Sequence, residues 1–444
     1  MKWKRENVDK KLNLNFLERE KNFLAILFIA ALLVRLCVIF MFTTGAELLD
    51  GPDQRYFNES ALNILKGEGY HYKVLQPDQH TGPDGDSLSF RVPLTSIFLA
   101  GIYSVFGHSY GAVRIIQAIL SALVCLVIYF ITKKIMDSKS ARIAGVISIL
   151  YYGLIAPILF LFKEILFGFF LVVAILYLLK IDESNGRRNQ IIAGITLGLS
   201  ALTASFTLIF PGFILIWLFE KYRNFKKAIL TFLFILIPFL LVLTPWVIRN
   251  YRIHHVFILS ATEGGFGFWV GNNPWAKGCA DSANLDFSKY AHLSEVEKNK
   301  AYYKEGLKYL LSAHPFRIAK LCSLKILTAL YPFLPVYDFS YALIFPFWLW
   351  GMWLGIKSRK KNGLLLYIFL NLLIVVAVFE GEPRMRESFS PYIIVFAAIA
   401  ASHLFEKYRL KRAIVVFSGW FLANYLVFIY SEPVRLFLKA TFKY

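Results

Sequence analysis

The stretch Leu49-Asp50-Gly51-Pro52-Asp53-Gln54-Arg55-Tyr56-Phe57-Asn58-Glu59 follows the first long apolar segment, residues 23–42. That segment has the length of a helix that crosses a hydrocarbon core, so the polar stretch after it should lie at a membrane edge. It carries two carboxylates, Asp50 and Asp53, beside an arginine and a tyrosine. A carboxylate at this place can take a proton from a hydroxyl or an amine. Equally, Asp53 can cap the helix expected to begin near Arg55.

The composition extends the membrane interpretation to the whole chain. Of 444 residues, 57% are hydrophobic and only 18% are charged, whereas a soluble domain is about half apolar and a quarter charged. The apolar residues form blocks of about 20 residues, and basic residues cluster in the short loops between them, as in cytoplasmic loops. The net charge of +20 therefore indicates contact with anionic lipid headgroups rather than with nucleic acid.

We expect an all-α polytopic membrane protein that forms a single integral membrane domain over residues 1–444, with about eleven transmembrane helices. The alternating basic loops predict a cytoplasmic N-terminus and a C-terminus outside. Two large segments should lie on the outer face, residues 43–108, which should hold interfacial helices, and residues 249–338. Residues 316–335 are apolar but carry two lysines, and we interpret them as interfacial or re-entrant.

Single polar residues in unusual places add further expectations. Arg35 lies inside the first apolar block, where a charge is costly, so it should face protein, water or a lipid phosphate. Cys279 and Cys322 lie in or beside the second outer segment, and a disulfide between them is an option if that segment faces an oxidising compartment. The cysteine spacings do not match a metal site.

Charged residues on the predicted outer face are candidates for a functional site. Lys163-Glu164 lies in a tight turn between two apolar blocks, where charges either face a cavity or simply make the turn polar. Arg91, Arg249 and the pair Arg384/Arg386 run against the bias for basic residues on the inner side. A guanidinium suits a phosphate at the headgroup level. The alternative is binding of ordinary lipid headgroups.

The stretch Gly264-Gly265-Phe266-Gly267-Phe268-Trp269-Val270-Gly271-Asn272-Asn273-Pro274 is a second type of candidate. Glycines let a backbone approach a ligand closely, and Trp269 with Asn272 and Asn273 would suit the face and hydroxyls of a sugar. An interfacial tryptophan on a turn-rich loop explains the same residues equally well.

Taken in order, these motifs resemble a known family over nearly the whole chain. They are Asp53-Gln54-Arg55-Tyr56-Phe57 with Ala61 and Gly67-Glu68-Gly69-Tyr70, Arg91-Val92-Pro93-Leu94, Lys163-Glu164, Thr244-Pro245-Trp246-Val247-Ile248-Arg249-Asn250 with Gly271-Asn272-Asn273-Pro274, and Arg384-Met385-Arg386 ahead of Pro391. The family is the polyprenyl-phosphate-dependent membrane glycosyltransferases of the GT-C superfamily, in the protein O-mannosyltransferase-like and aminoarabinose-transferase-like branch. The chain departs from it at Gln54, where the family has a second acid, unless Asp50 substitutes.

The resemblance implies a GT-C-type fold and an enzyme that moves a sugar from an undecaprenyl-phosphate-type donor to a lipid, glycan or protein acceptor, with inversion. The reaction would occur on the outer face of the plasma (inner) membrane. Asp53 would be the general base, with Asp50 as its helper or replacement, and Glu164 would orient the acceptor or the sugar. Arg384, Arg386, Arg249 and Arg91, in falling order, and Lys163 would bind the donor phosphate. The remaining substrate-binding candidates are Tyr56, Arg55, Trp269, Asn272 and Asn273.

No cofactor is expected with certainty; a divalent metal stays open, although no ligand set is visible in the sequence. A transporter or flippase of lipid-linked sugars would bind the same phosphate without chemistry. It would be expected to show inverted repeats, and none is visible, while the polar residues gather on one face. A polymerase or ligase of lipid-linked glycans is not separated from the main hypothesis, and a non-catalytic partner of a cell-wall assembly is disfavoured by the dense outer motifs.

Overall fold

The computed structural model describes residues 2–42, 52–73, 82–280, 282–332, 338–407 and 410–430. Over these residues the regular secondary structure is helical, apart from one short antiparallel pair of strands, β1 (Tyr72–Lys73) and β2 (Asp86–Ser87). The expectation of an all-α fold is therefore confirmed.

The helices follow the apolar blocks and the polar segments between them. In chain order they are α1 (Lys2–Phe42), α2 (Pro52–Leu65), α3 (Leu94–Phe106), α4 (Tyr110–Ile135), α5 (Ser138–Leu150), α6 (Tyr152–Ile155), η1 (Ala156–Leu159), α7 (Glu164–Leu179), α8 (Gly186–Thr203), η2 (Ser205–Thr207), α9 (Phe210–Tyr222), α10 (Phe225–His254), α11 (Gly264–Gly271), η3 (Ser288–Tyr290), α12 (Glu295–Ser312), α13 (Pro315–Leu330), α14 (Phe339–Lys357), α15 (Arg359–Val378), α16 (Pro383–Glu387), α17 (Ser390–Lys407) and α18 (Leu410–Ile429).

Several of these helices are long and apolar enough to cross a membrane. Within the described residues there are five, at Glu18–Phe42, Tyr110–Ile135, Ser205–Tyr222, Phe225–His254 and Phe339–Lys357, and a pair bent by 68° at residues 138–159 raises the number to six. Four further apolar helical stretches among the described residues have 10–17 residues, at Leu94–Phe106, Glu164–Leu179, Asn362–Val378 and Ser390–Glu406. At 1.5 Å per residue, such helices are shorter than the hydrocarbon core. The fold is thus of the membrane type, while the count of about eleven spans is not confirmed and stays a prediction.

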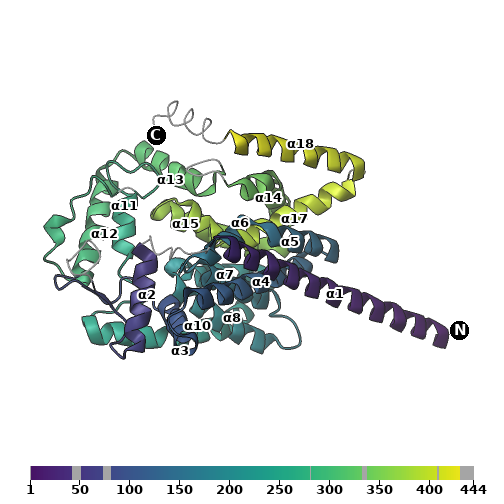
Figure 1. Ribbon diagram of the computed structural model, residues 1–444, viewed down its shortest axis with the longest axis horizontal. Coiled ribbons are helices and arrows are strands. Elements are labelled where there is room, and N and C mark those ends of the chain that lie inside the picture. The colour runs from purple at the N-terminus through teal and green to yellow at the C-terminus, as the bar shows by residue number, and fades with distance from the viewer. Residues whose placement is uncertain are drawn as a thin grey trace.

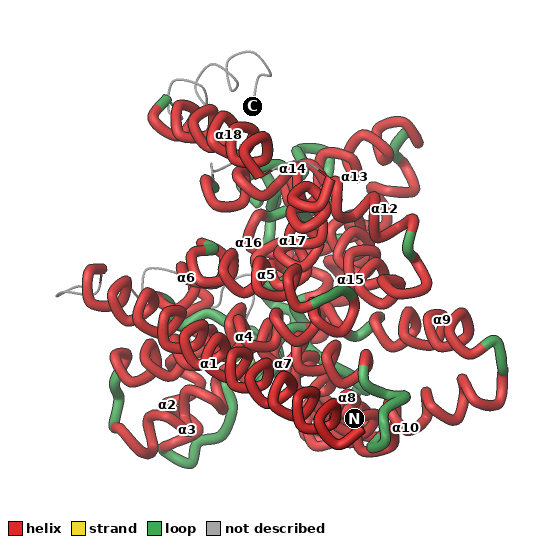
Figure 2. Tube along the Cα trace, turned by 90° about the vertical axis from the view of Figure 1, so that its right-hand side faces the viewer, coloured by secondary structure: helices red, strands yellow, loops and turns green. Residues whose placement is uncertain are grey.

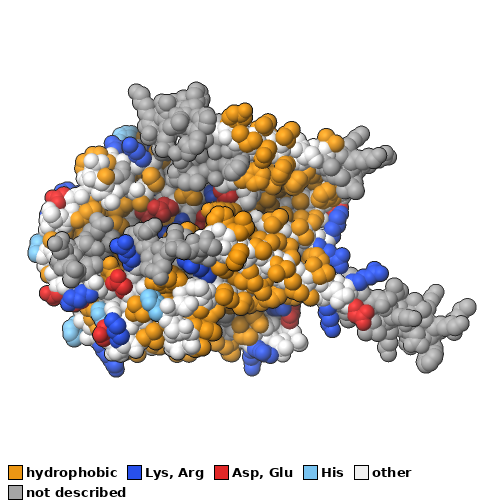
Figure 3. All heavy atoms as spheres, in the orientation of Figure 1, with side chains coloured by type: hydrophobic (Ala, Val, Ile, Leu, Met, Phe, Trp, Pro, Cys, Tyr) orange, Lys and Arg blue, Asp and Glu red, His pale blue; other side chains and the backbone are white. Residues whose placement is uncertain are grey.

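The helices surround a common core, with α8 packed between α7 and α10, and α14 packed on α17 (Figure 1). The tube in Figure 2 shows α1 running diagonally across the bundle over α4 and α7, while α2 and α3 lie together below it. On the face in Figure 3, a broad area of hydrophobic side chains lies between two ends that carry most of the charged groups. This distribution is the one expected of a protein embedded in lipid.

The packing shows where three kinds of unusual polar residue from the sequence lie. Arg35 is fully buried and faces protein, since its Nε donates to Ser121 Oγ at 2.7 Å and its Nη1 to Ala31 O at 2.9 Å. Cys279 and Cys322 do not form a disulfide. Lys325, in the segment interpreted as interfacial, is buried and its Nζ donates to Asn272 Oδ1 at 2.8 Å and to Ala377 O at 3.1 Å, so it ties α13 to α11 and α15.

Candidate functional site

Asp53 lies in the first turn of α2, where a proline at the first position and an acid beside it favour a helix start. Its two carboxylate oxygens face two arginines from distant segments. Oδ1 is 2.6 Å from Arg91 Nη2, and Oδ2 is 2.9 Å from Arg384 Nη2. One carboxylate therefore joins three parts of the chain through charge-assisted hydrogen bonds. These parts are α2, α16 and the segment that precedes α3.

Each arginine also holds a second carboxylate. Arg384 Nε is 3.3 Å from Glu164 Oε1, at the start of α7, and Arg91 Nη1 forms an ion pair with Glu263, just before α11. The result is an ion-pair row in the order Glu164, Arg384, Asp53, Arg91 and Glu263. The side chains of Asp53, Arg91 and Arg384 are 16%, 19% and 36% exposed, so solvent or a ligand can reach the middle of the row.

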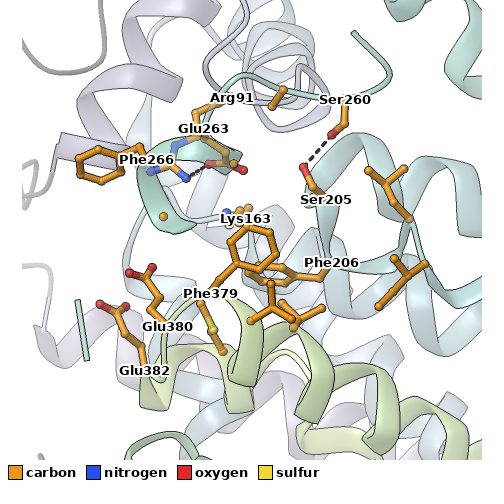
Figure 4. Close-up of a pocket in the computed structure, with 18 of the residues that line it drawn as sticks. Arg91, Lys163, Ser205, Phe206, Ser260, Glu263, Phe266, Phe379, Glu380 and Glu382 are labelled. Atoms are coloured by element: carbon orange, nitrogen blue, oxygen red, sulfur yellow. Dashed lines mark hydrogen bonds and ion pairs between the residues drawn. The ribbon is translucent and has the colours of Figure 1, made fainter. Parts of the chain in front are cut away.

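A cavity of about 420 Å³ lies beside the row, a size suited to a small ligand. Its polar wall holds Arg91, Lys163, Glu164, Glu263, Glu380, Glu382 and Arg384, and its apolar wall includes Phe206, Leu208, Ile209, Ile374, Val375, Val378 and Phe379. In Figure 4 the Arg91–Glu263 pair lies above the cavity, with Glu380 and Glu382 below it. The cavity therefore combines a charged part with a part that suits an apolar group.

Lys163 differs from the two arginines of the cavity. Its side chain is buried and its Nζ lies 5.4 Å from the centre of the Phe206 ring. In the part of the chain that is described, no ion pair joins it to a carboxylate within 4.0 Å, whereas Arg91 and Arg384 each have two such partners. Burial lowers the pKa of Lys163, against the opposing attraction of Glu263. Lys163 is thus a cation next to the cavity that an anionic ligand would satisfy.

The carboxylates of the site titrate very differently. Burial alone would raise the pKa of Asp53, but attraction to Arg91, Arg384 and Lys163 outweighs it and holds that pKa well below its usual range. Burial, followed by repulsion from Glu382, raises the pKa of Glu380 to about 7. Asp53 is therefore ionised and tightly held, whereas Glu380 can gain or lose a proton near neutral pH.

Five of the residues predicted from the sequence meet in this place: Asp53, Arg91, Lys163, Glu164 and Arg384. Asp50 lies outside the described residues. Glu263, Glu380 and Glu382 were missed as site residues. Their only sequence signal is that they adjoin the glycine-rich stretch and the arginine pair, and acidic residues in loops are usually just solvated.

Arg386 does not join the cavity. Its Nη2 is 3.4 Å from Asp338 Oδ2, and its guanidinium lies 3.8 Å from the centre of the Tyr341 ring. Residues two apart on a helix point about 200° apart around the axis, so the short helix α16 turns Arg384 and Arg386 to different sides. Arg386 therefore joins α16 to the start of α14.

Arg249 and Tyr56 lie behind the cavity wall. Arg249 Nη1 donates to Leu88 O at 2.8 Å, and its guanidinium lies over the Trp246 ring. Tyr56 is buried, and its hydroxyl accepts a hydrogen bond from Ser87 Oγ at 3.4 Å. Both residues support the segment that leads to Arg91. Arg55, the neighbour of Tyr56, has an exposed side chain.

The amide and tryptophan candidates of the second outer segment also serve the packing. Trp269 is buried and stacks on Tyr302 with ring centres 5.3 Å apart. Asn272 Nδ2 donates to Val378 O at 2.8 Å, and Asn273 Nδ2 donates to Val270 O at 2.7 Å. None of the three is among the described residues that line the cavity.

The carboxylates of the row do not resemble a metal site. Among the residues that the structure describes, no three His, Cys, Asp or Glu side chains are grouped to hold a metal ion. Asp53, Glu164 and Glu263 each face a guanidinium, which occupies oxygen atoms that a cation would need. The described carboxylates of the row therefore do not form a divalent-ion site in this arrangement.

Comparisons with known proteins place the fold. Residues 91–248 match the family described as dolichyl-phosphate-mannose-protein mannosyltransferase. The apo crystal structure of the Archaeoglobus fulgidus oligosaccharyltransferase is similar, with a TM-score of 0.57 and 17% identity over 93% of this chain and 55% of that one. The same organism's AglB, in complex with an inhibitory peptide and a dolichol-phosphate, gives 0.56 and 17% over the same shares.

ArnT from Cupriavidus metallidurans, bound to undecaprenyl phosphate, matches with a TM-score of 0.38 and 14% identity over 86% of this chain and 78% of that one. That score is too low to support an argument. The chain spans about half the length of the oligosaccharyltransferase that it matches. No curated protein sequence matches it significantly. The resemblance drawn from the sequence is confirmed by the family match and the fold.

Proposed function

We propose that the chain is a membrane glycosyltransferase with the GT-C fold and that it moves a sugar from an undecaprenyl-phosphate-type donor to a lipid, glycan or protein acceptor. In this proposal it resides in the plasma (inner) membrane with a cytoplasmic N-terminus, and it reacts on the outer face. The observation that carries the proposal is Asp53, held between Arg91 and Arg384, two arginines that line a cavity with one charged and one apolar wall.

The two arginines suit the donor phosphate. Each guanidinium already holds carboxylate oxygens at its N–H groups, and phosphate oxygens make the same charge-assisted contacts. Lys163 adds a third positive charge on the same cavity. A phosphate that enters would compete with Asp53 for Arg91 and Arg384. The carboxylate of Asp53 thus marks where phosphate oxygens would bind.

The exchange would also prepare Asp53 as the general base. While both arginines hold it, its low pKa makes it a poor proton acceptor. Once the arginines turn to the phosphate, the effect of burial is no longer outweighed and the pKa of Asp53 rises. Donor binding therefore activates the base.

The transfer then needs a single displacement. An acceptor hydroxyl or amine attacks the anomeric carbon of the sugar and gives its proton to Asp53, while the bond from that carbon to the phosphate oxygen breaks. The electron pair leaves with the lipid phosphate, whose added charge Arg91, Arg384 and Lys163 stabilise. One displacement inverts the anomeric centre, and no second carboxylate has to act as nucleophile.

The apolar wall supports a lipid-linked donor. Leu208 and Ile209, between η2 and α9, face Ile374 and Val378 of α15 across the cavity. The side chains of Ile209, Ile374 and Val378 are exposed, so this part of the wall is not covered by other side chains. An apolar wall next to the charged row would suit the prenyl chain of a lipid-linked donor.

The test compares two aspartates that each hold an arginine. Asp53→Asn removes the competitor of the phosphate, so we expect tighter binding of undecaprenyl phosphate by the purified protein, together with loss of sugar transfer. Asp338→Asn removes the partner of Arg386, away from the cavity, and keeps a side chain that can cap α14. It should leave lipid-phosphate affinity unchanged.

Full transfer by the Asp53→Asn protein would assign the base to another residue, with Asp50 next. Mass spectrometry of the lipid that copurifies identifies the donor headgroup directly, and a lipid without phosphate would contradict the proposal. A transporter of lipid-linked sugars would keep its activity in vesicles when Asp53 is replaced, and the same variant therefore separates the two functions.

A further inference from the structure

We propose that Glu295, at the start of α12, is a positioning residue that holds Arg91 and Glu263 in place from behind the cavity. The inference rests on the proposed function, because it assumes that Arg91 acts on the donor. Glu295 is buried, and it is not among the described residues that line the cavity. Its carboxylate instead contacts the two chain segments that carry the Arg91–Glu263 ion pair.

The contacts of Glu295 are specific. Oε2 accepts a hydrogen bond from Leu88 N at 2.6 Å, and Oε1 accepts one from Ser89 N at 3.0 Å. Thr262 Oγ1 donates a further hydrogen bond to Oε1. A direct bond from Thr262 N to Ser89 O, 2.9 Å long, joins the two segments.

The place of these contacts in the chain gives them their consequence. Ser89 lies two residues before Arg91, and Thr262 lies one residue before Glu263. Glu295 therefore holds the backbone two residues before Arg91 and the hydroxyl of the residue before Glu263, next to the two side chains of the ion pair. A shift of about 1 Å in a substrate-positioning group can reduce the rate of an enzyme about a hundredfold.

The surroundings explain why a carboxylate is used here. Arg249 donates to Leu88 O at 2.8 Å and to Ser89 Oγ at 3.1 Å, so residues 88–89 lie between an acid on one side and a guanidinium on the other. A glutamine at position 295 has one oxygen for two backbone donors, and its amide nitrogen would face an N–H group. The neutral side chain therefore loses the negative charge and one of the two oxygens that accept from Leu88 N, Ser89 N and Thr262 Oγ1.

The same helix turn provides a matched control. Glu297 forms the capping box of α12 with Ser294, and this contact is exposed to solvent. It is an acid in the same turn with a purely local role. Glu297→Gln should therefore leave sugar transfer unchanged, even though it alters the helix start.

The experiment uses the purified full chain and a polyprenyl-phosphate-linked sugar. Glu295→Gln should lower kcat/KM about tenfold to a hundredfold, and Glu295→Asp, which keeps the charge on a shorter side chain, should recover part of the loss. Thr262→Val removes only the hydroxyl donor and should give a smaller loss with the fold intact. The variants are compared as protein preparations of equal monodispersity, so that aggregation does not account for a lower activity.

A double-mutant cycle separates positioning from a general structural role. If Glu295 acts through Arg91, the double variant Glu295→Gln/Arg91→Gln should be no worse than Arg91→Gln alone. The same holds for Thr262→Val combined with Arg91→Gln, which keeps the test valid if the Glu295 variants do not fold. Losses that multiply would overturn the inference, as would full activity of both Glu295→Gln and Thr262→Val beside an impaired Arg91→Gln. Full activity of Arg91→Gln would instead contradict the proposed function.

Discussion

The short helix α16 carries two arginines that each face an aspartate, yet the two pairs lie in different surroundings. Arg384 and Asp53 are 36% and 16% exposed and lie beside the cavity, whereas Arg386 and Asp338 are 3% and 8% exposed. Arg386 also covers the Tyr341 ring and donates to Ala329 O at 3.3 Å. An arginine–aspartate pair thus lies on each side of the helix. The Arg384–Asp53 pair is open to a ligand, and the Arg386–Asp338 pair is enclosed by protein.

The difference in exposure suits the two pairs to different roles. Replacing the partner of Arg384 by a phosphate leaves the guanidinium with an anion, so the exchange costs little. Removing the partner of Arg386 leaves a charge inside the protein, which costs about 3–5 kcal/mol. The open pair is suited to binding and the sealed pair to cohesion.

The largest expected effect comes from replacing each arginine by glutamine. Arg384→Gln should fold but lose about a hundredfold to a thousandfold in transfer rate, since it removes a donor to the developing charge. Arg386→Gln should instead lower the free energy of unfolding by about 3–5 kcal/mol. Activity assays and thermal unfolding in detergent measure the two effects. If the two variants lose transfer activity and thermal stability to the same extent, the two pairs do not differ in role.

The next effect concerns Lys163, the cation of the cavity that lies over the Phe206 ring. Lys163→Met keeps the length of the side chain and removes the charge. A hydrogen bond to a charged group contributes about 1.5–3 kcal/mol, so the affinity for undecaprenyl phosphate should fall about tenfold to a hundredfold. Lys289→Met, in a cation–π contact away from the cavity, is the control. An unchanged affinity for Lys163→Met would exclude this residue from the phosphate site.

The sequence predicts the open pair only in part. The order of the motifs groups Asp53, Arg91, Glu164 and Arg384, because each is an unusual charge beside an apolar block. It treats Arg384 and Arg386 alike, because their separation depends on whether the chain between Glu382 and Ser388 forms a helical turn. Pro383 at the start of α16 favours such a turn, but the contact of Arg386 with Asp338 becomes visible only in the folded structure.

Other parts of the site could not be predicted from the sequence, for related reasons. Trp269, Asn272 and Asn273 look like sugar-binding residues, but amides and rings serve turns and packing equally well, and here they bond to backbone and stack on Tyr302. Glu380 looks like a loop acid, and its pKa is raised by burial and by repulsion from Glu382, which depend on the folded structure. The helical, membrane-type fold follows directly from the length and periodicity of the apolar blocks.

A smaller effect tests the geometry of the open pair rather than its charge. Arg384 contacts Asp53 through Nη2 and Glu164 through Nε, which a single ammonium group cannot reproduce. Arg384→Lys should therefore keep lipid-phosphate binding but lower transfer about tenfold, between the wild type and Arg384→Gln. If the lysine variant transfers sugar as fast as the wild type, the forked geometry of the guanidinium has no role. If it equals the glutamine variant, charge alone is insufficient.

The smallest expected effect is on pH dependence, and it concerns the cavity that only the open pair adjoins. Burial and then Glu382 raise the pKa of Glu380 to about 7, so Glu380 is neutral below that pH and adds a negative charge beside Arg91 and Arg384 above it. The affinity for a polyprenyl-phosphate sugar should therefore fall a fewfold as the pH rises through about 7, given the attenuation of such charges in proteins. A sugar diester is the right probe, because a free lipid phosphate gains a second charge itself near pH 6.

Two variants identify the group responsible. Glu380→Gln should remove the step, and Glu382→Gln should move it to lower pH, because it removes the repulsion that helps to raise the pKa of Glu380. Asp338→Asn, at the sealed pair, should leave the profile unchanged. A wild-type affinity that is constant between pH 6 and 8, about one unit either side of the expected midpoint, would mean that Glu380 does not act on the arginines of the open pair. In that case only the three carboxylates in direct contact, Asp53, Glu164 and Glu263, would offset the charge of the two arginines.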